Sequence, residues 1–383
     1  MEKRKKIWIF AGESSGDAYG AELAKSLSKL SPEPLFISGM GGEKMRSAGV
    51  EIMVDSTELG VVGFVEVFSK IFTFIKIFKY LVKKAVKEQP DAVVLIDYPG
   101  FNIRFAKEMK KRNINVVWYV SPQVWAWGKR RIPKLAEYCR KMLVIFPFEK
   151  SIFMDAGLDT DFVGHPLVDI VKRRTRQDIK KDKNLILILP GSRYNEVNRL
   201  FWPMLETALE LSNIKPELKF AVSLNRKSIQ ERCLEIYKKF KIKNSCENLK
   251  IDFSYGETDS LMQKASTGIA ASGTVTVESA IAGLPLVVVY KLNPITFFLG
   301  KLLVKLPYFT MVNIICGELV FMEFLQKEVN KDILSKAVLE ILPDGPRRAY
   351  VERKMNEMVD NISFKSESAS DNAANEILKI ISV

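Results

Sequence analysis

Histidine and cysteine, the side chains most used for metal binding and redox chemistry, are scarce in this sequence. His165 is the only histidine among 383 residues, so no histidine cluster can hold a metal and no pair of imidazoles can relay a proton. A structural role is expected for it. The four cysteines have neither disulfide nor metal-binding spacing, and reduced thiols in a cytosolic protein are expected. They are Cys139, Cys233, Cys246 and Cys316.

Long apolar runs and common phosphate motifs are also missing. No stretch reaches the roughly 18 uninterrupted apolar residues of a membrane span. The apolar run after the basic residues MEKRKK is too short for a signal peptide. The phosphate loop G-x-x-x-x-G-K-[ST] does not occur. A cytoplasmic protein, soluble or attached to a membrane from the cytoplasmic side, is expected.

Positive charge is abundant. Lysine and arginine number 58 against 45 acidic residues, which leaves a net charge of +13. Such a surplus indicates an anionic partner: nucleic acid, a phosphorylated ligand or an acidic lipid surface. Because the cations accompany aliphatic and phenylalanine runs, and no nucleic-acid-binding module is present, nucleic acid is not expected.

Short β-branched or aromatic runs alternate with helix-patterned stretches along the whole chain. The runs are 7–11, 35–39, 92–97, 115–120, 142–146, 185–190, 219–224, 249–254, 267–272 and 286–291. Nearly continuous apolar strands separated by helices are typical of parallel sheets covered on both faces. Two such series predict an α/β protein with two Rossmann-like domains.

The expected domains are 1–168, 169–342 and a set of C-terminal helices, 343–383, that packs back on the first domain. The charged segment VKRRTRQDIKKDK (171–183) is interpreted as a solvated linker and helix rather than a binding patch.

The first glycine-rich turn, in IWIFAGESSGDAYG (7–20), lacks the G-x-G-x-x-G spacing of a dinucleotide site. Glu13 would repel a pyrophosphate there, whereas Glu13 and Asp17 suit neutral hydroxyls or a proton to be removed. This turn is therefore predicted to bind the second substrate. The acceptor residues are expected to be Gly12, Ser15, Asp17 and Asn102.

Asp97 stands at the carboxyl end of the apolar run AVVLID, before Pro99 and Gly100. Ligands of open parallel sheets bind at such strand ends, and a partly desolvated carboxylate there is suited to general-base catalysis. Capping of the following helix is the structural alternative. Asp97 and Glu13 are the predicted catalytic residues.

Two motifs in the second half suit a nucleotide diphosphate. In LILILPGSR, Arg193 follows a strand and a Pro-Gly turn, and its guanidinium suits phosphate oxygens, although it could instead pair with an acidic neighbour. In TGIAASGTVTVE, a helix start offers N–H donors, with Glu278 one turn further on for ribose hydroxyls. An ordinary N-cap with an exposed glutamate is the alternative. The residues concerned are Ser272, Gly273 and Thr274.

In the segment VVGFVEVFSKIFTFIKIFKYLVKK (61–84), polar residues recur along one helical stripe and nearly all the others are Val, Ile, Leu or Phe. The polar residues are Glu66, Ser69, Thr73, Lys76 and Lys83. A buried helix is one interpretation, but the composition favours a helix lying in an anionic membrane interface. Similar mixtures recur in 294–309 and in SPQVWAWGKRR (121–131). The residues predicted to contact the membrane are Phe64, Phe68, Phe72, Phe74, Lys76, Phe78 and Lys79.

Taken together, several motifs resemble those of the bacterial lipid-A-disaccharide synthases. They are AGESSGDAYGA, GVVGFVEV, IDYPGFN, YVSPQVWAW, FPFEK, VGHPLVD, LPGSR, ASGTVTVE and VNIICGELV. They extend from about Ile7 to beyond residue 312, nearly the whole chain.

The resemblance implies a GT-B fold, in which two Rossmann-like domains face each other across a cleft. It implies an inverting, metal-independent and cofactor-free glycosyl transfer from UDP-2,3-diacylglucosamine to 2,3-diacylglucosamine 1-phosphate. Asp97 matches the family's proposed general base, and Asn313 falls, with Arg193 and Glu278, in motifs assigned to the donor or to activity. It also implies peripheral attachment to the inner membrane and is compatible with a homodimer.

The sequence departs from the family pattern at Gly100, where some members have an acidic residue. A mechanism that needs a second carboxylate at that position is therefore not supported here. Two alternatives share parts of the pattern: a UDP-N-acetylglucosamine 2-epimerase, which has no use for a lipid-binding helix, and a lipid-binding protein without catalytic activity.

Overall fold

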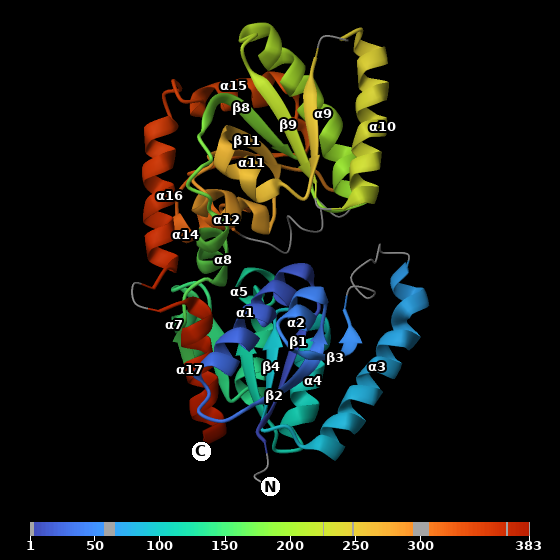
Figure 1. Ribbon diagram of the computed structural model, residues 1–383, viewed down its shortest axis with the longest axis vertical. Helices are drawn as coiled ribbons and strands as arrows, with labels where there is room; N and C mark the ends of the chain where they lie inside the picture. The colour runs from blue at the N-terminus through green and yellow to red at the C-terminus, as the bar shows by residue number, and fades with distance from the viewer. Residues whose placement is uncertain are drawn as a thin grey trace. The chain divides into compact units, whose positions relative to one another are not determined.

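The computed structural model divides into two compact units, 1–166 with 362–383 and 167–361 (Figure 1). The residues that the structure describes are 4–56, 66–224, 226–246, 249–293, 306–364 and 367–382. Within them, the side chains of 66–71 and 127 are not described.

The described part of the first unit is built on a seven-stranded parallel sheet of order β3-β2-β1-β4-β5-β6-β7. The strands are β1 (Lys6–Ala11), β2 (Phe36–Gly41), β3 (Glu51–Asp55), β4 (Ala92–Ile96), β5 (Asn115–Tyr119), β6 (Lys141–Val144) and β7 (Thr160–Phe162). In register, Ile9 of β1 lies between Gly39 of β2 and Val94 of β4. Because β1 and β4 are neighbours, the strand order reverses between them.

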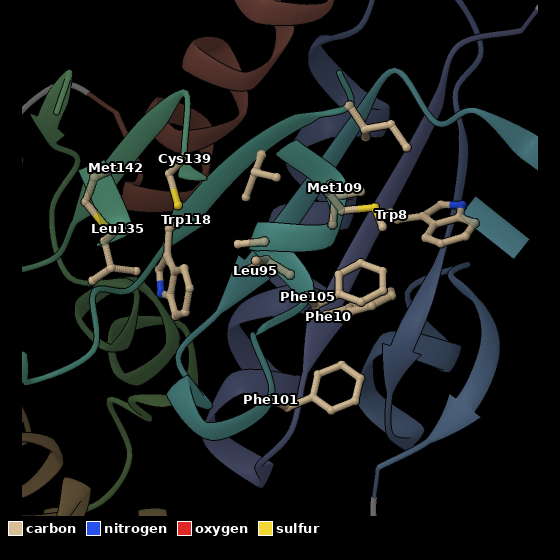
Figure 2. Packing of buried hydrophobic residues seen from close by; sticks show 14 of the residues in the cluster. Trp8, Phe10, Leu95, Phe101, Phe105, Met109, Trp118, Leu135, Cys139 and Met142 are labelled. Carbon is tan, nitrogen blue, oxygen red and sulfur yellow. The ribbon is translucent and has the colours of Figure 1, made fainter. Parts of the chain in front are cut away.

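Helices cover both faces of this sheet. They are α1 (Ser14–Leu30), α2 (Glu43–Ser47), α3 (Glu66–Glu88), α4 (Pro99–Lys110), α5 (Val124–Trp127), α6 (Ile132–Tyr138), α7 (Glu149–Met154) and α17 (Ala369–Ser382), with a 3-10 turn η1 (Lys129–Arg131). On one face, Phe10 packs against Phe105 with ring centroids 4.8 Å apart, and Trp8 and Phe101 belong to the same buried cluster (Figure 2).

The described part of the second unit repeats the plan with six parallel strands in the order β10-β9-β8-β11-β12-β13. The strands are β8 (Asp182–Leu189), β9 (Lys219–Leu224), β10 (Ile251–Tyr255), β11 (Ala265–Ala271), β12 (Leu286–Tyr290) and β13 (Met322–Leu325). The helices are α8 (Pro166–Arg174), α9 (Tyr194–Ile214), α10 (Lys227–Asn244), α11 (Thr258–Lys264), α12 (Thr274–Ile281), α14 (Met311–Cys316), α15 (Lys331–Ile341) and α16 (Arg348–Ile362), with η2 (Gln326–Glu328). Here the order reverses between β8 and β11.

The C-terminal helices divide between the two units. The sequence predicts that all of 343–383 packs on the first domain. In the structure, only residues 362–383 belong to the first unit. Arg348 of α16 donates to the carbonyl of Ser266 at 2.6 Å, which holds α16 on the second unit.

The last helix, α17, packs against α1 of the first unit (Figure 1). Its Glu376 meets Lys141 of β6 at 2.7 Å, and Lys141 also pairs with Asp159 and Asp161 around β7. These contacts attach α17 to the edge of the first sheet.

Candidate active site

The sequence-predicted residues cluster at the two points where the strand order reverses. In the first unit, Glu13 follows β1 and Asp97 follows β4, and these strands are neighbours. In the second, Arg193 follows β8 and Ser272 follows β11, which are also neighbours. Crevices at such switch points, beyond the carboxyl ends of the strands, are where open α/β sheets bind ligands.

The loop after β4 has an unusual backbone. Asp97 and Tyr98 both adopt left-handed conformations, with φ of 43° and 48°. The ring of Tyr98 lies against Gly12 so closely that no Cβ would fit there. A non-glycine residue with positive φ is uncommon, and two in succession at a strand end are typical of a functional site.

Asn102 stabilises the backbone of this loop through its side-chain amide. Its side chain is fully buried, and its Nδ2 donates to the carbonyl oxygens of Ile96 at 3.3 Å and Asp97 at 2.8 Å. The prediction that Asn102 lines the acceptor site is therefore corrected: its amide supports the backbone of Asp97.

The carboxyl group of Asp97 has a raised pKa. Burial, and secondarily the negative charge of Glu13, raise the pKa of Asp97 to about 6. The same two causes raise the pKa of Tyr98. Glu13 therefore lies close enough to Asp97 and Tyr98 for its charge to act on both. Glu13 itself is exposed at the start of α1, and Ser15 is half-buried in the first turn.

Asp17 has a different role from the predicted one. Its carboxylate is buried and accepts backbone N–H groups of Gly42 at 2.6 Å, Lys44 at 3.1 Å and Met45 at 3.2 Å. Asp17 thus caps the N-terminus of α2, and its oxygens are engaged by backbone rather than by substrate hydroxyls.

At the second switch point, Arg193 is the N-cap residue of α9, and its side chain is 70% exposed. Glu196 lies 3.6 Å from that guanidinium and also accepts the backbone N–H groups of Ser192 and Arg193. The alternative considered from the sequence, that Arg193 pairs with an acidic neighbour, is therefore met by Glu196. Arg193 nevertheless remains largely open to solvent, where a second anion can reach it.

The start of α12 is open. Gly273 and Thr274 are exposed, and a Cβ on Gly273 would meet no atom within 4 Å. Ser272 is half-buried at the end of β11, and its N–H donates to Val289. Glu278 lies one turn into α12 with its carboxylate 4.0 Å from Arg174. The first N–H groups of a helix are unpaired within it and favour an anion.

Asn313 differs from its prediction as a donor-binding residue. It is fully buried, and its Nδ2 donates to the carbonyl of Phe321 and to Glu323 Oε1, both at 2.7 Å. Its Oδ1 accepts the N–H groups of Val320 at 2.9 Å and Phe321 at 2.8 Å. The hydrogen bonds of its side chain thus join α14 to the segment that leads into β13 and to Glu323 of that strand, and α14 packs against α12.

Helix α3 buries some of the predicted membrane residues and exposes others. Phe74 and Phe78 pack on the core, and the ring of Phe78 meets that of Phe101 edge-on at 5.5 Å. Their assignment to the membrane is wrong, because they lie on the inner face of the helix. Phe72, by contrast, is 72% exposed.

The rest of the lipid-facing prediction falls partly outside the described residues. Phe64, the side chain of Phe68 and most of 294–309 lie outside the described residues. Lys76 and Lys79 are exposed on the same side of α3 as Phe72. Within the described parts of the chain, every helix is too short or too polar to cross a bilayer.

Trp125 and His165 are internal. Trp125 is buried and its indole N–H donates to Glu149 at 2.9 Å, so it is not a membrane anchor. Burial lowers the pKa of His165 to about 3, consistent with the structural role expected for it. Glu149 itself was not predicted from sequence, since a single glutamate in FPFEK gives no signal of its burial.

Solved structures identify the fold class. The glycotransferase of kitacinnamycin matches with a TM-score of 0.63 and 14% identity over 99% of both chains. A UDP-GlcNAc 2-epimerase from Methanocaldococcus jannaschii, in complex with UDP-GlcNAc and UDP, matches with a TM-score of 0.59 and 15% identity, again over 99% of both chains. The two doubly wound units thus form the GT-B fold, as predicted.

Sequence comparison then gives the family. A family model described as lipid-A-disaccharide synthetase matches residues 7–378. A lipid-A-disaccharide synthase of Koribacter versatilis is 37% identical over 98% of both chains, and one of Trichlorobacter lovleyi is 38% identical over 91% of both. The chain belongs to the lipid-A-disaccharide synthase family and is a glycosyltransferase, which confirms the resemblance drawn from its motifs.

Proposed function

We propose that the chain transfers 2,3-diacylglucosamine from UDP-2,3-diacylglucosamine to the 6-hydroxyl of 2,3-diacylglucosamine 1-phosphate, with inversion. The products are the β-1,6-linked disaccharide 1-phosphate and UDP. One observation carries the proposal: in a chain of this family, Asp97 stands at the switch point of the first sheet with its pKa raised to about 6.

In this reaction Asp97 removes the proton from the acceptor hydroxyl as that oxygen attacks. A carboxyl group with a pKa near 6 is mostly ionised at neutral pH, yet more basic than an ordinary aspartate. Glu13 supports this role, because its charge raises the pKa of Asp97. Gly12 and Ser15, in the same turn, are proposed to contact the acceptor.

The donor UDP is proposed to bind at the second switch point. Its diphosphate lies at the start of α12, on Ser272, Gly273 and Thr274, where helix N–H groups and open space are available. Arg193 contacts the same phosphates through its exposed guanidinium, and Glu278 accepts hydrogen bonds from ribose hydroxyls.

Negative charge develops on UDP as the glycosidic bond breaks. The α12 N-terminus and Arg193 stabilise this charge. The crystallised neighbour that holds UDP and UDP-GlcNAc on the same fold supports a uridine nucleotide as the donor group.

The enzyme is further proposed to lie on the anionic inner membrane, from which it takes both acylated substrates. The exposed face of α3 supports this, because Phe72, Ile75 and Tyr80 are 72%, 46% and 49% exposed beside Lys76 and Lys79. Aromatic and aliphatic side chains flanked by lysines are typical of helices at an anionic interface.

The test is incubation of the protein with both lipid substrates while UDP release and disaccharide formation are followed. Asp97→Asn is expected to abolish transfer but to retain UDP-sugar binding, whereas Asp332→Asn, at an exposed aspartate of α15, serves as the matched control. Failure of the wild type to form disaccharide would reject the function. Near-normal turnover by Asp97→Asn would reject the base.

A parallel incubation with UDP-GlcNAc tests the epimerase alternative. That enzyme would convert the sugar to its C2 epimer without any lipid acceptor. Inversion at C2 would favour the alternative, and recovery of unchanged UDP-GlcNAc would favour the synthase.

A further inference from the structure

A third left-handed residue lies beside Asp97. Val120, directly after β5, has φ of 64°, a conformation that is strongly unfavourable for a β-branched side chain. Its carbonyl oxygen accepts the backbone N–H of Asp97 at 3.3 Å and the indole N–H of Trp118 at 3.1 Å. The strained residue thus supports the backbone of the proposed base.

The residue after Val120 is held by a buried carboxylate. Ser121 Oγ donates to Glu149 Oε1, which also accepts the Trp125 indole N–H at 2.9 Å. Glu149 Oε2 accepts the N–H of Phe146 at 3.3 Å. A single side chain therefore ties the loop after β5 to the loop after β6.

Burying this carboxylate is costly. Glu149 is 1% exposed, and burial raises its pKa to about 7. A glutamine or an apolar residue would avoid that cost. None of the proposed substrate contacts involves Glu149, so its cost is not explained by substrate binding.

We propose that Glu149 is a positioning residue: through Ser121 it keeps Val120 in its left-handed conformation and thereby fixes the backbone that carries Asp97. This inference rests on the proposed function, in which Asp97 is the base. Glu149 touches neither substrate, and its effect reaches the reaction only through the loop after β5.

The test uses Glu149→Ala, Val120→Gly and the double variant, because glycine adopts positive φ without strain. Glu149→Ala is expected to lower kcat about tenfold or more, with a smaller change in the KM for the UDP-sugar. Val120→Gly alone should lower kcat less than Glu149→Ala does. In the double variant, glycine should restore most of the lost kcat, since its backbone no longer needs Glu149.

A residue that only stabilised the fold would give a different pattern. The double variant would then be no more active than Glu149→Ala, and that result would overturn the proposal, as would wild-type kcat in Glu149→Ala. Should the alanine variant not fold, Ser121→Ala removes the same hydrogen bond but leaves Glu149 its bonds to Trp125 and Phe146, and it is paired with Val120→Gly in the same way.

Hydrogen exchange of the intact protein provides a readout that needs no activity. Loss of Glu149 should speed amide exchange in the 92–102 peptide, but not in 265–281 of the second unit, and Val120→Gly should not reproduce the effect. Unchanged exchange in 92–102 would reject the positioning role. If the wild type made no disaccharide, the function would fail while this measurement still decided the role of Glu149.

Discussion

The ring of Tyr98 lies against Gly12, and three of its ring carbons are within 2.6 Å of the place where a Cβ of residue 12 would stand. A side chain there must push the ring away, and with it the left-handed pair that carries Asp97. We expect Gly12→Ala to lower kcat about tenfold or more while the protein stays folded.

The control for this change is Gly100→Ala, because a Cβ on Gly100 meets no atom within 4 Å. Steady-state assays of disaccharide formation and thermal unfolding of both variants compare them directly. Equal activity of the two alanine variants would contradict a tight Gly12–Tyr98 contact.

The rate of transfer should depend on pH through Asp97. Because the base must be ionised, kcat/KM is expected to rise with pH and level off above about 6, the pKa of Asp97. The charge of Glu13 raises that pKa, so Glu13→Gln should move the rising limb to lower pH. It should stay above 3.8, since burial, the larger cause, is retained. A limb that did not move, or moved to higher pH, would contradict the coupling.

Asn313 and Glu323 should act as one unit. Asn313→Ala leaves buried backbone groups of Val320 and Phe321 without their partner and is expected to cost about 2–4 kcal/mol of the free energy of unfolding. UDP binding should weaken too, because α14 packs on α12. Glu323→Ala should cost less when Asn313 is already alanine, since both changes remove the same hydrogen bond.

Denaturant unfolding and UDP titration of the two single variants and the double variant measure this coupling. Additive losses would indicate that the two side chains act independently. Full stability with lost UDP binding in Asn313→Ala would instead favour direct contact between Asn313 and the nucleotide.

The two faces of α3 should respond differently to serine. The double change Phe72→Ser and Ile75→Ser removes exposed apolar surface. Burial of each apolar side chain in lipid contributes about 1.5–3 kcal/mol to the free energy of binding, so binding to anionic vesicles is expected to fall by tenfold or more. The stability of the fold should not change. Phe78→Ser removes a core contact with Phe101 and should lower the melting temperature. Vesicle sedimentation and thermal unfolding separate the two effects, and undiminished binding by the first variant would reject the membrane face.

Much of the fold could be predicted from the sequence because its central strands are apolar throughout. All ten predicted strands are present within a few residues. The missed strands, β3, β7 and β13, are short edge strands with partly exposed side chains. Without a continuous apolar run, they have no clear signature.

The positions of the site residues were easier to predict than their contacts. Strand ends predicted where Asp97 and Ser272 lie, but the partners of Asp17 and Asn313 are backbone groups 25 and 8 residues away. Such pairings depend on tertiary packing. Similarly, phenylalanine content alone does not distinguish Phe72 from Phe78, because the rotation of α3 about its axis is fixed by what it packs against.

Helix α17 belongs to the first unit but follows the whole second unit along the chain. During synthesis, the ribosome must therefore complete residues 167–361 before Ala373, Ala374 and Ile377 can bury their side chains beside α1. Until then the nascent first unit carries an uncovered apolar surface, and Lys141 of β6 lacks Glu376 as one of its partners. A chain interrupted within the second unit would keep that surface exposed and become a substrate for chaperones and proteases.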